Sequence, residues 1–147
     1  MAFNLRVYGL LIVDNHVLVT HESYRDLNFT KFPGGGLERK EGLKDCLVRE
    51  FEEELGLSVE VGSLFYVNDF YQPSAFCKDD QIISFYYLVK PLDVESTTKQ
   101  ILALQNSNNP EQPEWMAFHH IKQDVFNFPI DKIVCEKLTT FLLENKC

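Results

Sequence analysis

Four glutamates stand within five positions of the segment REFEEELGL, residues 49–57: Glu50, Glu52, Glu53 and Glu54. Like charges three or four residues apart destabilise a helix by about 0.2–0.5 kcal/mol per pair, so the cluster is unfavourable unless a cation compensates it. In a helix Glu50, Glu53 and Glu54 share one face, and Glu52 points elsewhere. Carboxylate oxygens are the ligands that Mg²⁺ and Mn²⁺ prefer, so the segment predicts a divalent metal site.

A run of glycines precedes this segment, in KFPGGG at residues 31–36. Glycine lets the backbone approach a ligand closely, so that carbonyls can ligate a metal. Amide groups, or the N-terminus of the helix that follows, can meet phosphate oxygens. The glutamates alone could form a solvated acidic face, and the glycines alone could form a tight turn. Together they favour a metal site that holds a pyrophosphate.

The two segments combine into one pattern of fixed spacing, G-x5-E-x7-R-E-U-x-E-E-x-G-U, in which U is a bulky apolar residue. It begins at Gly35, passes through Glu41 and ends at Leu57, and every fixed position is filled. The pattern resembles the Nudix box, the signature of MutT-like hydrolases that act on nucleoside diphosphates linked to another moiety. Phe51 stands where a bulky aliphatic residue is more usual. That departure affects packing and leaves the chemistry intact.

The resemblance implies a metal-dependent hydrolase with Mg²⁺ or Mn²⁺ as cofactor, in which the metal activates water and neutralises charge on the phosphoryl oxygens. It implies that Arg49 orients a metal-binding glutamate and that Glu41 pairs with Arg49, both as supports for the metal ligands. The metal ligands that it implies are Glu50, Glu53, Glu54 and the carbonyl of Gly35.

The general base varies across the family, and the sequence leaves it open. Glu50 is the candidate within the box. The alternatives are acids on downstream segments, namely Asp79, Asp80, Glu111 and Glu114.

Substrate choice rests on residues outside the box. Phe70 and Tyr71 are candidates to stack on a base, because an aromatic ring stacks on any base. Pro73 follows Leu57 by 16 residues, an offset that resembles the ADP-ribose-hydrolysing subgroup, although a loop between strands also accounts for a proline there. Arg6 could reach a phosphate. The compact length resembles the members that act on nucleoside triphosphates, so both substrate classes, (d)NTPs and ADP-ribose or ADP-sugars, stay open.

Hydrophobic periodicity predicts the elements that must position these residues. Apolar residues at every fourth position predict a helix over 43–55, and a second amphipathic helix is expected over 129–145. Residues 21–30 are polar and read as a loop. Strands are expected over 4–14, 16–20, 58–71, 81–90 and 114–121, with a short helix near 97–105. The resemblance adds the fold class, a Nudix-type α/β/α sandwich with a central mixed sheet, formed by residues 1–147 as a single domain.

Composition limits the partners. The net charge is −8, which disfavours a nucleic acid polymer. No apolar run approaches the ~20 residues that span a bilayer, and the N-terminus lacks a signal-peptide pattern, so a cytoplasmic protein without a membrane partner is expected. The four cysteines form no C-x-x-C motif and are expected to be reduced: Cys46, Cys77, Cys135 and Cys147. The expected partner is a small nucleotide, bound by a monomer or homodimer.

Two other functions stay open at this stage. One is a non-catalytic Nudix-like domain that binds or senses a nucleotide metabolite. Inactivity against a broad nucleotide panel with Mg²⁺ and Mn²⁺ would favour it. The other is an acidic metal-binding protein, which tight metal binding without a nucleotide-dependent thermal shift would favour.

Overall fold

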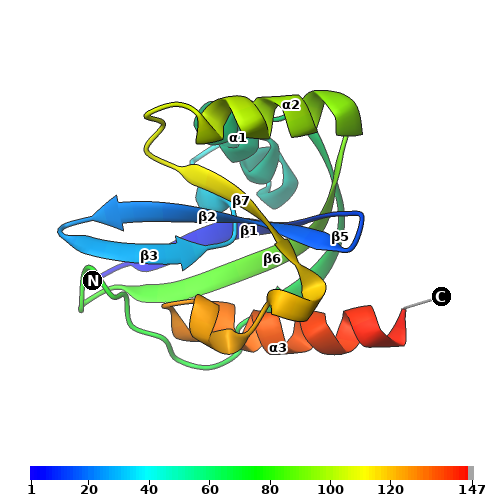
Figure 1. Cartoon of the computed structure of the whole chain (residues 1–147). Coiled ribbons are helices and arrows are strands. Elements are labelled where there is room, and N and C mark those ends of the chain that lie inside the picture. The colour runs from blue at the N-terminus through cyan, green and yellow to red at the C-terminus, as the bar shows by residue number, and fades with distance from the viewer. Residues whose placement is uncertain (146–147) are drawn as a thin grey trace.

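A twisted β-sheet lies at the centre of the computed structural model, which describes residues 1–145 (Figure 1). The strands are β1 (Phe3–Val13), β2 (His16–Tyr24), β3 (Leu27–Lys31), β4 (Gly34–Gly36), β5 (Val59–Val67), β6 (Gln81–Pro91) and β7 (Gln112–Ala117). The helices are α1 (Leu43–Leu55), α2 (Val94–Gln105) and α3 (Pro129–Glu144), with short 3₁₀ turns at Phe118–His120 and Gln123–Val125.

The sheet is mixed, because one pair of strands is parallel and the others are antiparallel. Strand order is β3-β2-β1-β6-β5, with β4 paired to β1 and β7 paired to β2. β1 runs parallel to β6 over most of its length, from Phe3 opposite Gln81 to Leu11 opposite Val89. β4 runs antiparallel to β1 and sets Gly35 opposite Val7.

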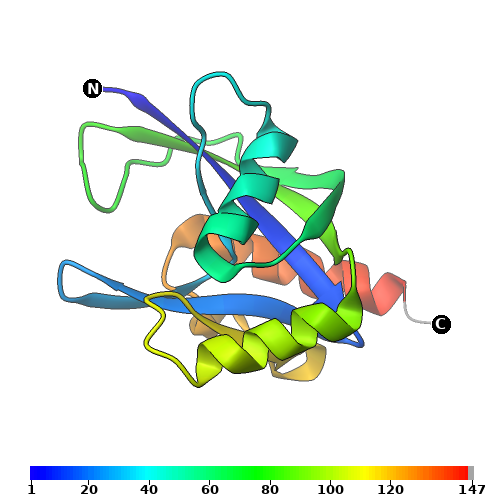
Figure 2. The same cartoon turned by 90° about the horizontal axis from the view of Figure 1, so that it is seen from above.

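Helices cover both faces of this sheet. α1 and α2 lie over one face and α3 lies over the other (Figures 1 and 2). The alternation of β1 side chains explains the two cores, since successive residues of a strand point to opposite faces. Val7 packs in the cluster that includes Phe51 of α1, whereas Tyr8 packs in the cluster that includes Val134 and Leu138 of α3.

The helix that carries the four glutamates has the bounds that periodicity predicted. α1 buries Leu47, Phe51 and Leu55 along one stripe. It ends at Gly56, whose φ of 65° is the left-handed conformation that favours glycine after a helix. The predicted C-terminal helix is also confirmed, and α2 begins a turn earlier than predicted, at Val94, because Asp93 caps its N-terminus.

The prediction of a loop over residues 21–30 is wrong. These residues continue β2, turn at Arg25 and Asp26, and return as β3. Both turn residues have positive φ, 51° and 64°, which is the backbone of a tight two-residue hairpin. The hairpin was missed because its turn has no glycine and its strands are polar. Predicted strands over 58–71 and 114–121 end early, at Val67 and Ala117.

Two further sequence expectations concern features outside the sheet. Within residues 1–145, no helix combines the length and the apolar character that crossing a bilayer requires. Cys46 and Cys135 are buried free thiols and Cys77 is an exposed one, whereas Cys147 lies outside the described residues.

A buried carboxyl joins α3 to the sheet. Asp131, in the first turn of α3, is only 3% exposed, and its Oδ1 accepts a hydrogen bond of 2.5 Å from the hydroxyl of Tyr86. Burial raises the pKa of Asp131 to about 6, although the Tyr86 hydrogen bond and the charges of Lys31 and Arg6 oppose that rise. This carboxyl is therefore harder to ionise in the folded state than in the unfolded chain, and its ionisation at neutral pH lowers the free energy of unfolding.

Asp131→Asn should make the protein more stable at pH 7. The pKa of Asp131 is about 6 in the folded state and about 3.9 in the unfolded chain. The contribution of this carboxyl to the free energy of unfolding is therefore complete below about pH 3.9 and is lost as the pH rises through about 6. Asparagine keeps the acceptor for Tyr86 and never ionises. We expect the variant to gain roughly 2 kcal/mol over wild type between pH 4 and pH 7. Urea unfolding at both pH values measures this gain, and Asp124→Asn, an exposed control, should show no such pH-dependent difference.

Candidate functional site

The carboxyl group of Glu50 lies directly against the backbone of Gly35. A Cβ placed on Gly35 would be 2.6 Å from the Glu50 Cδ and Oε1 atoms, so any side chain at position 35 would displace the carboxyl. Glu50 is itself buried on the inner side of α1. This close approach requires glycine, and it brings a carboxylate and a main-chain segment together at one point.

The guanidinium of Arg49 donates hydrogen bonds to several acceptors and so holds the Glu50 carboxyl beside the glycine segment. Its Nε and Nη2 donate to the two oxygens of Glu41 at 3.0 and 2.8 Å, and Nη2 also donates to the Gly36 carbonyl at 3.1 Å. Nη1 donates to Glu50 Oε1 at 3.1 Å and to Glu53 Oε2 at 3.0 Å. The hydrogen bond from Arg49 lowers the pKa of Glu41 to about 2, so this carboxylate stays charged. The guanidinium thereby ties α1 to the glycine segment.

The three glutamates expected to share a ligand set do not all point the same way. The Glu53 side chain is 60% exposed and bound to Arg49, whereas the Glu50 side chain is 11% exposed. Glu54 is half-buried and in hydrogen-bonding contact with Glu50. Over residues 1–145, no three His, Cys, Asp or Glu side chains converge as a group that could hold a metal ion. The structure thus brings Glu50 and Glu54 together and sets Glu53 beside Arg49.

The Glu50–Glu54 pair is suited to a hard divalent cation. The pKa of Glu54 is raised to about 8, chiefly by burial and also by the hydrogen bond to Glu50 and the charges of Glu50 and Glu22, against the opposing charge of Lys31. Two carboxyls in contact therefore retain a proton near neutral pH. Oxygen donors from these carboxyls and from the adjacent Gly35 backbone are the donor type that Mg²⁺ and Mn²⁺ take, and a cation can replace the proton.

Two charged residues that the sequence reading did not single out border the pair. Lys31 is only 6% exposed, and its Nζ contacts Glu22 Oε2 at 2.9 Å and the carbonyls of Phe32 and Gly34 at 3.3 Å each. Its ammonium also lies 5.5 Å from the centre of the Tyr8 ring. Because Lys31 is a buried cation beside several acids, it offsets part of their mutual repulsion. The prediction of a loop over residues 21–30 did not place Lys31 near the acids, because only the hairpin brings Glu22 and Lys31 to one face.

Of the four downstream acids considered as a general base, Glu111 lies near enough to Glu22 and Glu50 to interact with their charges. Burial is the main cause that raises the pKa of Glu111, and the charges of Glu22 and Glu50 raise it further. The other three are placed differently. Asp79 is exposed, Asp80 accepts a hydrogen bond from the backbone nitrogen of Ala2 at 3.1 Å, and Glu114 Oε1 lies 2.6 Å from His21 Nε2.

The four residues expected to bind substrate separate into two groups. Arg6 borders the acids: its Nη1 is 3.6 Å from a Cβ built on Gly36, and its Nε donates to the Tyr8 hydroxyl at 2.6 Å. Tyr8 is the main cause that raises the pKa of Arg6, and the charges of Glu50 and Glu54 also raise it.

The other three expected substrate residues, Phe70, Tyr71 and Pro73, lie on the exposed connection between β5 and β6. This connection projects on the same side of the molecule as the β2–β3 hairpin (Figure 2). Its Phe76 ring packs edge-on to Tyr24 of that hairpin, with 4.9 Å between ring centres.

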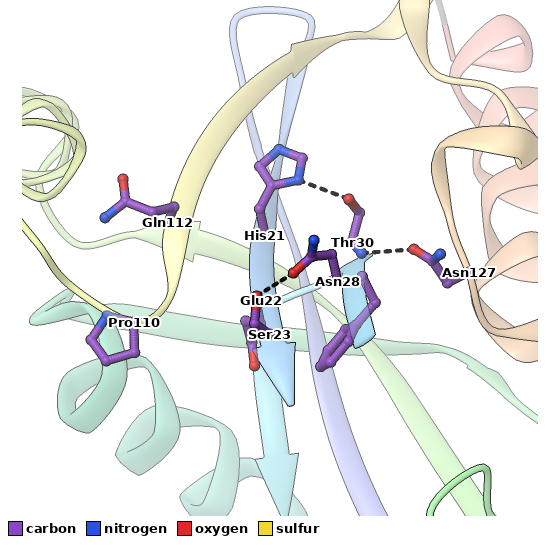
Figure 3. A pocket seen from close by; sticks show the side chains of 9 residues that line it. His21, Glu22, Ser23, Asn28, Thr30, Pro110, Gln112 and Asn127 are labelled. Carbon is purple, nitrogen blue, oxygen red and sulfur yellow. Dashed lines mark hydrogen bonds between the residues drawn. The ribbon is translucent and has the colours of Figure 1, made fainter. Parts of the chain in front are cut away.

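An open pocket of about 330 Å³ lies beside the hairpin (Figure 3). His21 is one of the residues that line it, with Nδ1 2.7 Å from Thr30 Oγ1, and Asn127 accepts a hydrogen bond from the Thr30 backbone. The lining residues are mostly polar and uncharged: His21, Glu22, Ser23, Asn28, Phe29, Thr30, Pro110, Gln112 and Asn127. Pro110 and Gln112 flank Glu111 in the sequence, so the segment that carries Glu111 forms part of the wall of this pocket.

Both the sequence and the fold of this chain are similar to those of known proteins. The sequence matches the NUDIX domain over residues 3–136. No curated protein matches the sequence. Among solved structures, the Escherichia coli ORF135 protein is 17% identical, with a TM-score of 0.64 over 100% of this chain and 96% of that one. A MutT NUDIX hydrolase from Burkholderia pseudomallei is 19% identical, with a TM-score of 0.67 and coverage of 93% and 98%. An ADP-ribose pyrophosphatase from Streptococcus suis is 18% identical, with a TM-score of 0.63 and coverage of 98% and 92%.

Gly35→Ala should weaken divalent cation binding much more than Gly36→Ala. The new methyl at position 35 would overlap the Glu50 carboxyl at 2.6 Å, whereas at position 36 the nearest atom is Arg6 Nη1 at an ordinary 3.6 Å. Displacing Glu50, an expected ligand, should cost at least about 10-fold in Mn²⁺ affinity. The measurement is the Mn²⁺-dependent rise in melting temperature, fitted for the dissociation constant. Equal Mn²⁺ affinity in the two variants would place the cation away from Gly35.

Proposed function

This chain belongs to the Nudix hydrolase family, and from that premise we propose that it is a Mg²⁺- or Mn²⁺-dependent pyrophosphohydrolase of a nucleoside diphosphate linked to another moiety. Nudix hydrolases cleave pyrophosphate bonds and generally use divalent metal ions. The predicted Nudix-type α/β/α sandwich is confirmed by the family match and by the likeness of fold. The observation that supports this proposal in the chain's own residues is the position of Glu50, which lies against the Gly35 backbone and beside Glu54.

We assign the metal to Glu50, Glu54 and the carbonyl of Gly35. Glu53 stays a proposed ligand on the same turn of α1, and it would have to exchange its ion pair with Arg49 for the metal. When bound, the cation supplies positive charge against the phosphoryl oxygens and acidifies a water molecule. The protein's part is to keep the two carboxyls beside the glycine backbone, which Arg49 does through Glu41, Glu50 and Gly36.

The chain's other charged groups have distinct proposed tasks. Arg6 borders Glu50 and Glu54 and supplies a fixed cation for a phosphate oxygen of the substrate. Glu111 would accept the proton of the attacking water, because a base is most effective when its pKa lies near the working pH and burial raises the pKa of Glu111. Glu50 is the alternative base, but its Oε1 already accepts a hydrogen bond from Arg49 at 3.1 Å.

The substrate's second moiety stays open between the two classes that the sequence suggests. Phe70, Tyr71 and Pro73 are proposed to line its binding site from the β5–β6 connection, where exposed aromatic rings can stack on a base. The pocket lined by Pro110 and Gln112, the sequence neighbours of Glu111, offers a second place for an uncharged group (Figure 3). Hydrolysis assays with dNTPs, ADP-ribose and ADP-sugars decide between the classes.

Glu54→Gln tests the metal-dependent hydrolysis directly. The change keeps the shape of the side chain and removes a ligand charge, so we expect at least a ~100-fold loss of kcat on whichever substrate the wild type cleaves. Glu52→Gln is the matched control, since Glu52 is exposed on another face of α1, and it should stay within about twofold. Phosphate release with Mg²⁺ and Mn²⁺ measures both variants. Unchanged turnover in Glu54→Gln would remove this residue from the active site.

Glu111→Gln tests the base. Loss of a general base should lower kcat by about 10²–10⁴-fold and abolish the fall in rate on the acid side of the pH profile, while the Mn²⁺-dependent rise in melting temperature is retained. Glu114→Gln, which alters only an exposed contact with His21, should leave the profile as in wild type. A normal rate and profile in Glu111→Gln would transfer the role to Glu50.

A further inference from the structure

The last turn of α1 has its free carbonyls capped by amide side chains from a distant segment. The final carbonyls of a helix have no partner within it and need donors from elsewhere. Gln100 of α2 donates from Nε2 to the Leu55 carbonyl at 2.9 Å. Asn109, in the loop between α2 and β7, donates from Nδ2 to the Glu54 carbonyl at 3.3 Å. Both donors therefore attach the segment spanning α2 and its following loop to the helix that carries Glu50 and Glu54.

Asn109 differs from Gln100 in making a second bond of functional interest. The same Nδ2 atom donates to the backbone carbonyl of Glu111 at 2.6 Å. A carboxamide nitrogen carries two hydrogens, so one side chain can serve both carbonyls. The two carbonyls belong to Glu54 and Glu111, whose side chains are the proposed metal ligand and the proposed base.

The loop is folded around this residue and held there by further amide contacts. Gln112 donates from Nε2 to the Asn109 carbonyl at 2.9 Å and to the Leu104 carbonyl at 3.1 Å. The backbone nitrogen of Asn109 donates to Ser107 Oγ at 3.2 Å. Because these hydrogen bonds hold the Asn109 backbone in place, its side chain can fix the position of Glu111 relative to α1.

We propose that Asn109 is a positioning residue that sets the distance between the proposed base Glu111 and the metal-binding turn of α1. The inference rests on the proposed function. Its amide nitrogen is a direct link between the backbones of Glu54 and Glu111, which are 57 residues apart in the chain. A misplacement of about 1 Å in a reacting group can cost on the order of 10²-fold in rate, so loss of this link should act on the chemical step.

Gln100 supplies the matched control because it caps the same helix end without touching Glu111. Asn109→Ala and Gln100→Ala each remove one amide donor from the last turn of α1, and we expect similar falls in melting temperature. Only Asn109→Ala should lower kcat, by at least about 10-fold, with KM within about threefold of wild type. Asn109→Asp keeps the shape but loses the donors, and it should reproduce the kcat defect.

A double variant separates positioning from general destabilisation. If Asn109 acts through Glu111, Asn109→Ala should lower kcat no further in a Glu111→Gln background, because the group that it positions is already gone. Equal kcat in Asn109→Ala and Gln100→Ala, or fully additive losses in the double variant, would overturn the inference while the hydrolase activity of wild type stands. A wild type that cleaves no substrate in the panel would reject the proposed function, and this role with it.

Discussion

The close approach of the Glu50 carboxyl to the Gly35 backbone is the constraint on which the site depends. It demands that residue 35 lack a side chain, that β4 pair with β1 so that Gly35 faces α1, and that α1 pack against the sheet through Phe51 and Leu55. Arg49 secures the same approach from the side, because its guanidinium binds Glu41, Glu50 and the Gly36 carbonyl together. The box pattern in the sequence is thus a set of packing and hydrogen-bonding requirements around one contact between a helix and a glycine backbone.

Around that contact the fold gathers more negative charge than it neutralises. Glu22, Glu50, Glu54 and Glu111 influence one another, and the cations that oppose them are Lys31, Arg6 and Arg49, of which Arg49 is shared with Glu41 and Glu53. Buried carboxylates are costly unless they are paired, and here one of them retains its proton instead. This leaves a local deficit of positive charge that a divalent cation can fill, which is a physical reason for the proposed metal dependence.

Local patterns in the sequence predicted the parts of the site that lie within one element, and missed those that depend on distant segments. The helix over 43–55 follows from its own apolar spacing and from Gly56, and the pairing of Arg49 with Glu41 accompanies the box spacing. By contrast, Glu22 and Lys31 come together only through a hairpin whose turn, Arg25–Asp26, carries no glycine. The sequence left four downstream acids open as the base, and only the folding of the α2–β7 loop brings Glu111 near Glu22 and Glu50.

Arg49 of the same helix pairs with Glu50 and Glu53, and the position of the acids along α1 explains why further partners come from outside the helix. Glu53 and Glu54 lie in the last turn, where the helix dipole places partial negative charge, and that turn contains no basic residue. Negative side chains there add to the repulsion from the free carbonyls. The structure answers with donors and cations from other segments: the amides of Gln100 and Asn109 satisfy two carbonyls, and Lys31 lies among the acids. A metal bound at the same end would interact favourably with the negative end of the helix dipole as well as with the carboxylates. The acids that destabilise this turn of α1 in isolation therefore also favour the binding of a cation there.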